Sequence, residues 1–261
     1  MRVDVYLAEY GYAPSRQRAK SLIEGGLVFI DGKRVQKPSE QIEDSQHAVD
    51  VTDTLAYVGR GGLKLEAALA SFSIQVSGIT ALDIGASTGG FTDCLLQNGA
   101  KKVYAVDAGE GQLAPKLLRD QRVVCKEHFN ARNLTLDDLD GTAVDCIVMD
   151  VSFISATYIL PRFPLVLKER GNAICLIKPQ FEVGRAMIGK GGIVKGRAAY
   201  QYAIERVFSS AYVSDLIPVG LIPSPILGGD GNREFLVHLQ YHSSDLRKLN
   251  EDDIYQLLHS I

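Results

Sequence analysis

Short apolar runs alternate with amphipathic stretches from residue 63 to residue 239, and this alternation constrains the fold more than any other feature of the chain. Repeated strand–helix units of this kind place helices on both faces of a mostly parallel sheet, so the pattern predicts a wound α/β fold. The expected strands span residues 81–84, 103–106, 123–125, 146–149, 173–177, 216–221 and 235–239. The expected helices span residues 63–72, 91–97, 113–118, 159–167, 200–211 and 254–261.

The first 50 or so residues have a different organisation, with short helices followed by a hairpin. Ser15 is a natural N-cap for a helix that ends at Gly25 and Gly26. The apolar residues 27–30, the Asp-Gly turn at 31–32 and the residues 33–35 then predict two paired strands. We therefore expect a small domain over residues 1–52, a linker over 53–60 and a larger domain over 61–261.

Positive charge is unevenly distributed along the chain. The formal net charge is −3 and the pI is about 6.0, so the overall balance does not favour binding to a polyanion. Basic residues nevertheless gather in the first domain, where they form either a solvated helix face or a surface for RNA. They are Arg2, Arg16, Arg18, Lys20, Lys33, Arg34 and Lys37.

The four cysteines are widely scattered and show no C-x-x-C spacing, which predicts buried thiols in a reducing compartment and no metal site. No apolar run approaches the roughly 18 residues that a membrane span needs, and the N-terminus lacks the apolar stretch of a signal peptide. We therefore expect a cytoplasmic protein without membrane contact. No feature of the sequence sets an oligomeric state.

The glycine-rich segment 83–91 lies where the first strand of the larger domain turns into a helix, which is where open α/β sheets bind nucleotides. A dinucleotide fingerprint would need a second glycine at the position of Ser87. A nucleophile elbow, G-x-S-x-G, fits residues 85–89, but its histidine should lie on a late loop and His238 lies within a strand. S-adenosylmethionine is the third interpretation, because an acidic, glycine-bearing turn suits its sulfonium and amino-acid ends.

Two acids support that third interpretation. Asp83 lies at the turn itself, and Asp107 ends the next strand, where a carboxylate can accept both hydroxyls of a ribose. Asn130, after the third strand, is either a contact to the adenine edge or a turn former. The alternative for Asp83 and Asp107 is that both are solvated acids at strand ends and bind no ligand. The residues expected at the donor site are Asp83, Gly85, Ala86, Ser87, Gly89, Gly90, Phe91, Asp107, Asn130 and Asp150.

A second set of charged residues follows the later strands. Asp150 and Lys178 each come directly after an apolar strand, so both point into the crevice at the carboxyl edge of the sheet. Burial of either charge alone would be costly, which favours a functional pair. Glu234 begins the last strand, and Lys64 lies on the helix before the sheet.

These motifs resemble known families over nearly the whole chain. The N-terminal pattern R-x-D-x-x-L and S-R-x-x-A-x-x-L-I, continued by G-x-V and V-x-K-P-S, is similar to the alpha-L RNA-binding domain. The strings G-R-G-G-L-K-L, D-I-G-A-S-T-G-G-F-T, V-D-A-G-x-G-Q-L, M-D-V-S-F-I-S, K-P-Q-F-E-V-G and G-N-R-E-F resemble FtsJ-type ribose methyltransferases. Both parts, in this order, resemble the TlyA (hemolysin A) family.

The resemblance implies a small N-terminal α+β RNA-binding domain, followed in the chain by a Rossmann-like class I methyltransferase domain. The sheet of the second domain would have seven mostly parallel strands, with the last strand antiparallel. It implies S-adenosylmethionine-dependent 2′-O-methylation of a ribose, that of a cytidine, in ribosomal RNA or ribosomal subunits. The catalytic tetrad would be Lys64, Asp150, Lys178 and Glu234. A ribose hydroxyl is a weak nucleophile and needs a proton acceptor, for which Lys178 is our candidate because burial and the charge of Lys64 favour its neutral form.

Residues 183–197 are rich in glycine and basic side chains, and they form either an ordinary exposed connection or a mobile flap that closes on RNA. The residues expected to contact RNA are Arg2, Arg16, Arg18, Lys20, Lys33, Lys37, Arg60, Arg185, Lys190 and Arg197.

Three rival functions compete with this interpretation. A pure binding protein would use the first domain to deliver an inactive second domain, but the tetrad argues against it. A small-molecule methyltransferase would leave the basic first domain unexplained. A pore, which the hemolysin name suggests, would need a membrane-inserting segment that the sequence lacks.

Overall fold

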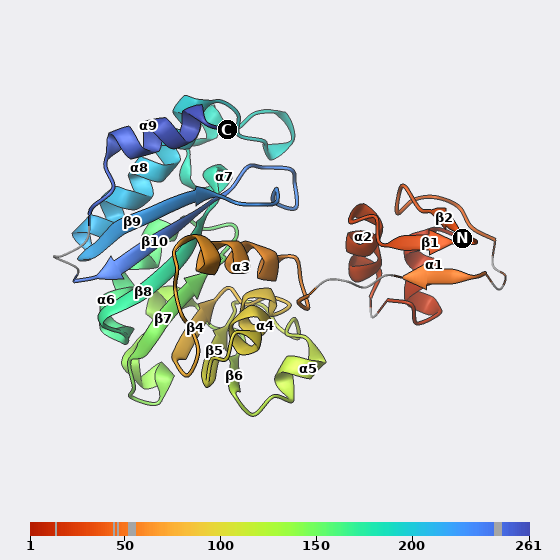
Figure 1. Ribbon diagram of the computed structural model, residues 1–261, viewed down its shortest axis with the longest axis horizontal. Coiled ribbons are helices and arrows are strands. Elements are labelled where there is room, and N and C mark those ends of the chain that lie inside the picture. The colour runs from red at the N-terminus through yellow and green to blue at the C-terminus, as the bar shows by residue number, and fades with distance from the viewer. Residues whose placement is uncertain (14, 44, 46, 52–55, 243–246) are drawn as a thin grey trace. The chain divides into compact units, whose positions relative to one another are not determined.

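The computed structural model describes residues 1–13, 15–43, 45, 47–51, 56–242 and 247–261, and it divides into two compact units, Met1–Leu55 and Ala56–Ile261 (Figure 1). Residues 52–55, where we predicted the end of the first domain and the start of a linker, lie outside the described residues. The rest of the predicted linker belongs to the second unit: Tyr57 is 5% exposed in its core, and the N–H of Val58 donates to Asp93. The second unit therefore begins before residue 61.

The first unit packs two helices against a three-stranded antiparallel sheet. The predicted cap and turn are confirmed, since the side chain of Ser15 accepts from the N–H of Arg18 and both turn residues, Asp31 and Gly32, have positive φ. The third strand was not predicted, because Val49, Asp50 and Val51 alternate apolar and polar residues over only three positions, which is too short a run to indicate a strand. The elements are α1 (Val3–Glu9), α2 (Arg16–Glu24), β1 (Val28–Ile30), β2 (Lys33–Arg34) and β3 (Val49–Val51).

The second unit is built on a seven-stranded sheet with the order β6-β5-β4-β7-β8-β10-β9. The five strands from β6 to β8 run parallel, and β10 runs antiparallel to both of its neighbours, which confirms the predicted last strand. The strands are β4 (Thr80–Ile84), β5 (Lys102–Val106), β6 (Val123–Lys126), β7 (Val144–Met149), β8 (Leu167–Ile177), β9 (Leu216–Pro223) and β10 (Phe235–Tyr241).

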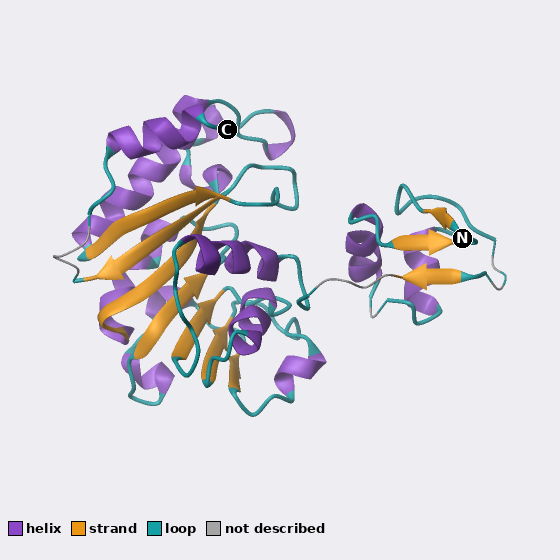
Figure 2. Ribbon diagram, in the orientation of Figure 1, coloured by secondary structure: helices purple, strands orange, loops and turns teal. Residues whose placement is uncertain are grey.

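Helices cover both faces of this sheet (Figure 2), and the strand residues alternate between the two cores. On one face, Cys146 and Val148 pack with apolar residues of α3 and α4. On the other face, Ile147 and Met149 pack with those of α8 and α9. The helices are α3 (Gly61–Ser71), α4 (Gly90–Gln97), α5 (Pro115–Leu118), α6 (Phe163–Val166), α7 (Pro179–Glu182), α8 (Arg197–Val213) and α9 (Glu251–His259). Short 3-10 turns are η1 (Ala131–Asn133), η2 (Leu136–Leu139), η3 (Ala156–Tyr158), η4 (Leu160–Arg162), η5 (Arg185–Met187) and η6 (Lys190–Gly192).

The long helix predicted over residues 159–167 is wrong. The chain instead forms η4 and the four-residue α6, and then enters β8 at Leu167. Pro161 and Pro164 each lack an N–H, and each sits within the first turn of its own short helix. A proline in the interior of a longer helix would remove a backbone hydrogen bond and clash with the preceding turn, so the segment breaks into short pieces.

The cysteines largely follow the prediction. Cys94, Cys146 and Cys175 are free and buried, whereas Cys125, which lies in the edge strand β6, is free and only partly buried. Among the helices of the described residues, none combines the length and the apolar character needed to cross a membrane.

Candidate active site

The turn after β4 joins two strand ends at the carboxyl edge of the sheet. The N–H of Asp150 donates to the carbonyl of Ile84, and Gly85 has a φ of +82°. A Cβ at Gly85 would lie 2.5 Å from the backbone carbonyl oxygen of Asp150, so only glycine fits this close approach. The glycine thus lets the first turn and the end of β7 form one wall.

A cavity opens beside this wall in two adjoining parts. They share Gly85, Ser87, Asp150 and Ser152, and their volumes are about 230 Å³ and about 510 Å³. The smaller part reaches Lys178, and the larger part extends to Asp107. Most of the predicted donor-site residues line one part or the other: Gly85, Ala86, Ser87, Gly90, Phe91, Asp107, Asn130 and Asp150.

Asp107 lines the larger part of the cavity and is fixed there by two backbone hydrogen bonds. Its Oδ2 accepts from the N–H of Ser87 at 2.8 Å, and its Oδ1 accepts from the N–H of Gly109 at 2.7 Å. A carboxylate oxygen can accept more than one hydrogen bond, so both oxygens retain capacity for the hydroxyls of a bound ribose. Glu127, which the sequence interpretation did not single out, accepts from the N–H groups of Gly111 and Gln112 and fixes the same rim.

Asp83 and Gly89 are exceptions, because neither lines the two parts of the cavity. The side chain of Asp83 is fully buried and accepts from Thr92 Oγ1 at 2.6 Å, and burial raises its pKa to about 7. Its Oδ1 has no hydrogen-bond partner among the described residues. Gly89 has a φ of +94° at the start of α4, where a Cβ would meet Leu117. Both residues support the turn from the side that faces away from the cavity, and their direct contact with the methyl donor stays a prediction.

Asn130 is a turn former, as one of its two predicted roles required, and its contact with adenine stays a prediction. Its side-chain oxygen accepts from the N–H of Arg132 and caps η1, as expected of a turn former. The residue also lines the larger part of the cavity, beside Phe129 and Ile159. The cap fixes the orientation of the amide at the cavity wall.

The four residues of the predicted tetrad come together from four different elements. Asp150 lies between the two lysines, with its Oδ1 2.6 Å from Lys178 Nζ and its Oδ2 3.8 Å from Lys64 Nζ. Lys64 Nζ also donates to Glu234 Oε2 at 2.6 Å. The order Glu234, Lys64, Asp150, Lys178 therefore forms one chain of alternating charge. Asp150 and Lys178 line the cavity, whereas Lys64 and Glu234 are not among its lining residues.

This charge chain is largely withdrawn from water. The side chains of Lys64 and Glu234 are 9% and 3% exposed, and those of Lys178 and Asp150 are 11% and 20% exposed. Paired charges in such surroundings interact more strongly than in water. Gly228 is needed for this packing, because a Cβ there would lie 2.5 Å from Glu234 Oε1.

The sequence interpretation missed the residues just after Asp150. Ser152 Oγ accepts from Lys178 Nζ at 2.7 Å, so the lysine has a second partner. Phe153 is 92% exposed at the cavity with a φ of +65°, and its ring centroid lies 5.4 Å from that of Phe181. The sequence did contain a signal for these two residues, because Ser152 and Phe153 belong to the string M-D-V-S-F-I-S that contains Asp150. Their residue types alone do not distinguish this segment from an ordinary loop.

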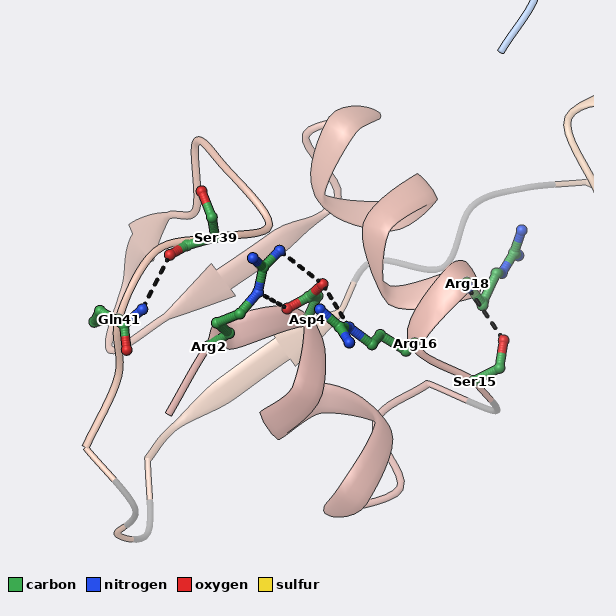
Figure 3. A network of polar contacts seen from close by, with 7 residues as sticks. All are labelled: Arg2, Asp4, Ser15, Arg16, Arg18, Ser39 and Gln41. Atoms are coloured by element: carbon green, nitrogen blue, oxygen red, sulfur yellow. Dashed lines mark hydrogen bonds and ion pairs between the residues drawn. The ribbon is translucent and has the colours of Figure 1, made fainter. Parts of the chain in front are cut away.

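In the first unit, part of the predicted basic surface is bound to a buried acid. Arg2 and Arg16 approach Asp4 from two sides (Figure 3) and form ion pairs of 2.8 Å and 2.9 Å with it. The hydrogen bond from Arg2 is the main cause that lowers the pKa of Asp4 to about 2. Both arginines remain partly exposed, at 39% and 52% of the side chain. Their charge is therefore partly neutralised before any ligand binds.

The other predicted RNA-contact residues differ in exposure. Lys33 and Lys37 are exposed, whereas Arg18, Lys20 and Arg60 are partly buried. Arg185, Lys190 and Arg197 are exposed on the segment after α7. That segment is anchored, because the N–H of Val194 donates to the buried side chain of Asn232 at 2.9 Å and Asn232 donates back to the carbonyl of Gly192.

Comparisons with known proteins agree with this architecture. A family described as FtsJ-like methyltransferase matches residues 57–241, and a family described as S4 domain matches residues 1–47. The 16S/23S rRNA (cytidine-2′-O)-methyltransferase TlyA of Mycobacterium tuberculosis is 42% identical over 240 residues, which cover 92% of this chain and 89% of that protein. Hemolysin A of Brachyspira hyodysenteriae is 42% identical over 241 residues, which cover 91% and 99%.

A solved structure from Streptococcus thermophilus that carries a hemolysin name has 41% identity and a TM-score of 0.80, covering 100% of this chain and 94% of its own. The matches span both units, and they include the segments that carry the cavity and the charge chain. The chain therefore belongs to the TlyA (hemolysin A) family, which joins an N-terminal S4 domain to an FtsJ-like methyltransferase domain.

Proposed function

We propose that this protein transfers a methyl group from S-adenosylmethionine to the 2′-oxygen of a ribose, most specifically that of a cytidine in ribosomal RNA. The observation that carries the proposal is the charge chain of Lys64, Asp150, Lys178 and Glu234, two members of which, Asp150 and Lys178, line a nucleoside-sized cavity. The relative from M. tuberculosis is named for this reaction on 16S and 23S rRNA. Ribosomal RNA and reduced thiols both point to the cytoplasm as the place of action.

The residues of the cavity fit the methyl donor. Asp107 would accept the ribose hydroxyls, and the apolar side chains of Phe129 and Ile159 would contact the adenine. The carboxylate of Asp150, at the junction of the two parts, would face the positive end of the ligand. When bound, S-adenosylmethionine supplies an electrophilic methyl group on a sulfonium.

The chain's own residues must then orient the attacking hydroxyl and remove its proton. Lys178 lies in the smaller part of the cavity, where the hydroxyl would have to enter. It is our candidate proton acceptor in its neutral form, which it reaches by releasing one ammonium proton to solvent before the reaction. Asp150, in ion-pair contact with Lys178, would stabilise the ammonium that forms. Lys64, held by Glu234, would balance the charge of Asp150 and keep it in place. Fixing these groups before reaction supplies much of the rate, because no reorganisation is then needed.

Two further features favour RNA over a small substrate. The S4 domain adds exposed Lys33 and Lys37, which can contact phosphates without reading sequence. Phe153 presents most of its ring at the cavity mouth, where an unpaired base could stack on it. A small-molecule methyltransferase would have no use for either feature.

The test is methyl transfer to ribosomal RNA from a strain that lacks this protein. Purified subunits are incubated with tritiated S-adenosylmethionine, and the label is mapped by nuclease protection and by the resistance of the 2′-O-methylated linkage to alkali. We expect label at a cytidine ribose with the wild-type protein and none with the Lys64→Met/Lys178→Met double variant. RNA binding without any transfer by the wild-type protein would instead support a binding-only role.

A further inference from the structure

A buried carboxylate outside the charge chain joins the two segments that carry Asp150 and Lys178. Glu182 is 2% exposed and is the last residue of α7, four residues after Lys178. Its Oε2 accepts from Ser155 Oγ at 2.5 Å, and its Oε1 accepts from the N–H of Ala156 at 2.7 Å. Both partners lie on the segment that follows Asp150, so one side chain connects the two segments.

The same two segments are already in contact at their other end. Lys178 Nζ forms an ion pair with Asp150 and donates to Ser152. Segment 150–156 is therefore attached to segment 178–182 at both of its ends, by Lys178 at the cavity and by Glu182 behind it. A loop that is fixed at two points keeps one geometry, whereas a loop fixed at one point can pivot about it.

The environment of Glu182 argues against a role in packing alone. Burial of a carboxylate costs free energy, and an apolar side chain would fill the same space at lower cost. Burial raises the pKa of Glu182, opposed by the hydrogen bonds from Ser155 and Ala156 and by the positive charge of Arg206. The Arg206 guanidinium also donates to the backbone carbonyl of Glu182, which ties α7 to α8. The carboxylate is thus a fully engaged connector.

We propose that Glu182 is a positioning residue for methyl transfer, which fixes the separation of Asp150 and Lys178 by binding Ser155 and Ala156. The proposal rests on the proposed function of the charge chain. Glu182 itself lies behind the cavity wall and acts only through these neighbours. Misplacement of a reacting group by about 1 Å can cost on the order of 100-fold in rate, so a pivoting loop would have a measurable effect.

The test compares three variants and one control variant in the full-length protein. Glu182→Ala removes both hydrogen bonds and should lower kcat for methyl transfer by roughly 10- to 100-fold. Glu182→Gln can still accept from the N–H of Ala156 and should recover most of the rate. Ser155→Ala removes only one partner and should give a smaller loss than Glu182→Ala. Glu169→Gln, at a side chain that is 80% exposed, serves as the matched control and should leave kcat unchanged.

A second readout separates positioning from a loss of folded protein. The active fraction of each variant is measured as the stoichiometry of bound S-adenosylmethionine, and kcat is corrected for it and followed from pH 6 to pH 9. We expect the half-maximal pH to move in Glu182→Ala and to return in Glu182→Gln, because the contact between Asp150 and Lys178 sets it. An unshifted profile, or a loss fully explained by the active fraction, would overturn the proposal. A wild-type protein that transfers no methyl group would instead sink the proposed function itself.

Discussion

The two units each contain a cluster of opposite charges, and the clusters are built in opposite ways. In the first unit one carboxylate, Asp4, is completely buried while its partners Arg2 and Arg16 are 39% and 52% exposed. In the second unit both signs are withdrawn from water, and the most exposed member, Asp150, has only 20% of its side chain accessible.

This difference in burial separates a surface that can take up a ligand from a site that can do chemistry. Exposed guanidinium groups can add a phosphate contact while they keep their bond to Asp4, because arginine has several donors. The lysines of the second unit are enclosed by fixed partners, which gives strong electrostatics and little freedom. We therefore expect substitutions in the first cluster to change stability and RNA affinity, and substitutions in the second to change the rate of transfer.

The largest effect should follow from Lys178. Removal of the proton acceptor in Lys178→Met should lower kcat by about 10²- to 10⁴-fold, while the binding of S-adenosylmethionine stays within a few fold. Single-turnover transfer to ribosomal RNA and donor titration measure the two quantities. If Lys178→Arg transferred at the wild-type rate at every pH, proton acceptance by this residue would be wrong.

Phe153 tests whether the exposed ring at the cavity mouth serves RNA. Loss of one stacked base costs about 1–3 kcal/mol, so Phe153→Ala should lower kcat/KM for RNA by a corresponding factor. Phe153→Tyr should preserve the activity because it keeps the ring. Equal loss in both variants would show that stacking is not the reason for the exposure.

Asp4 tests the structural side of the comparison. Asp4→Asn should destabilise the first unit by about 1–2 kcal/mol, discounted for the solvent exposure of both arginines. Because the folded pKa is lowered to about 2, the contribution of Asp4 is complete above its ordinary value of 3.8 and is lost as the pH falls from there toward 2. Urea unfolding is measured at pH 7 and at pH 2, with hydrogen exchange in α1 as the probe of the first unit. The difference in stability between the wild type and Asp4→Asn should be present at pH 7 and mostly lost at pH 2.

The smallest effect should come from a single exposed lysine of the first unit. Lys37→Gln should weaken RNA binding a few fold and reduce the slope of log affinity against log salt by about 1, because one phosphate contact is lost. Binding titrations at several salt concentrations measure this slope. An unchanged slope would remove Lys37 from the interface, and a loss of kcat at saturating RNA would contradict the division of roles between the units.

The sequence predicted the sheet, the S4-type unit and the four members of the charge chain. It failed for one helix whose local signals were misread, and it could not decide the surroundings of individual side chains, which depend on tertiary packing. Asp83 and Asp107 are both acids at strand ends, yet one is buried behind the turn and the other lines the cavity. The helix over residues 159–167 failed because apolar spacing was given more weight than two prolines. Glu182 belongs to the string K-P-Q-F-E-V-G, but the sequence does not show that its side chain binds Ser155 and Ala156.

The order of apolar runs, turns and strand-end residues is enough to predict most of the elements and the edge of the sheet that carries the charged residues, because strand alternation and glycine turns are local properties. The folded chain alone shows that Asp150 lies between Lys64 and Lys178 and that Glu234 pairs with Lys64. It also shows that Glu182 binds the loop that follows Asp150. These facts are distances and burial between residues far apart in the chain, and they are set by the packing of several elements at once.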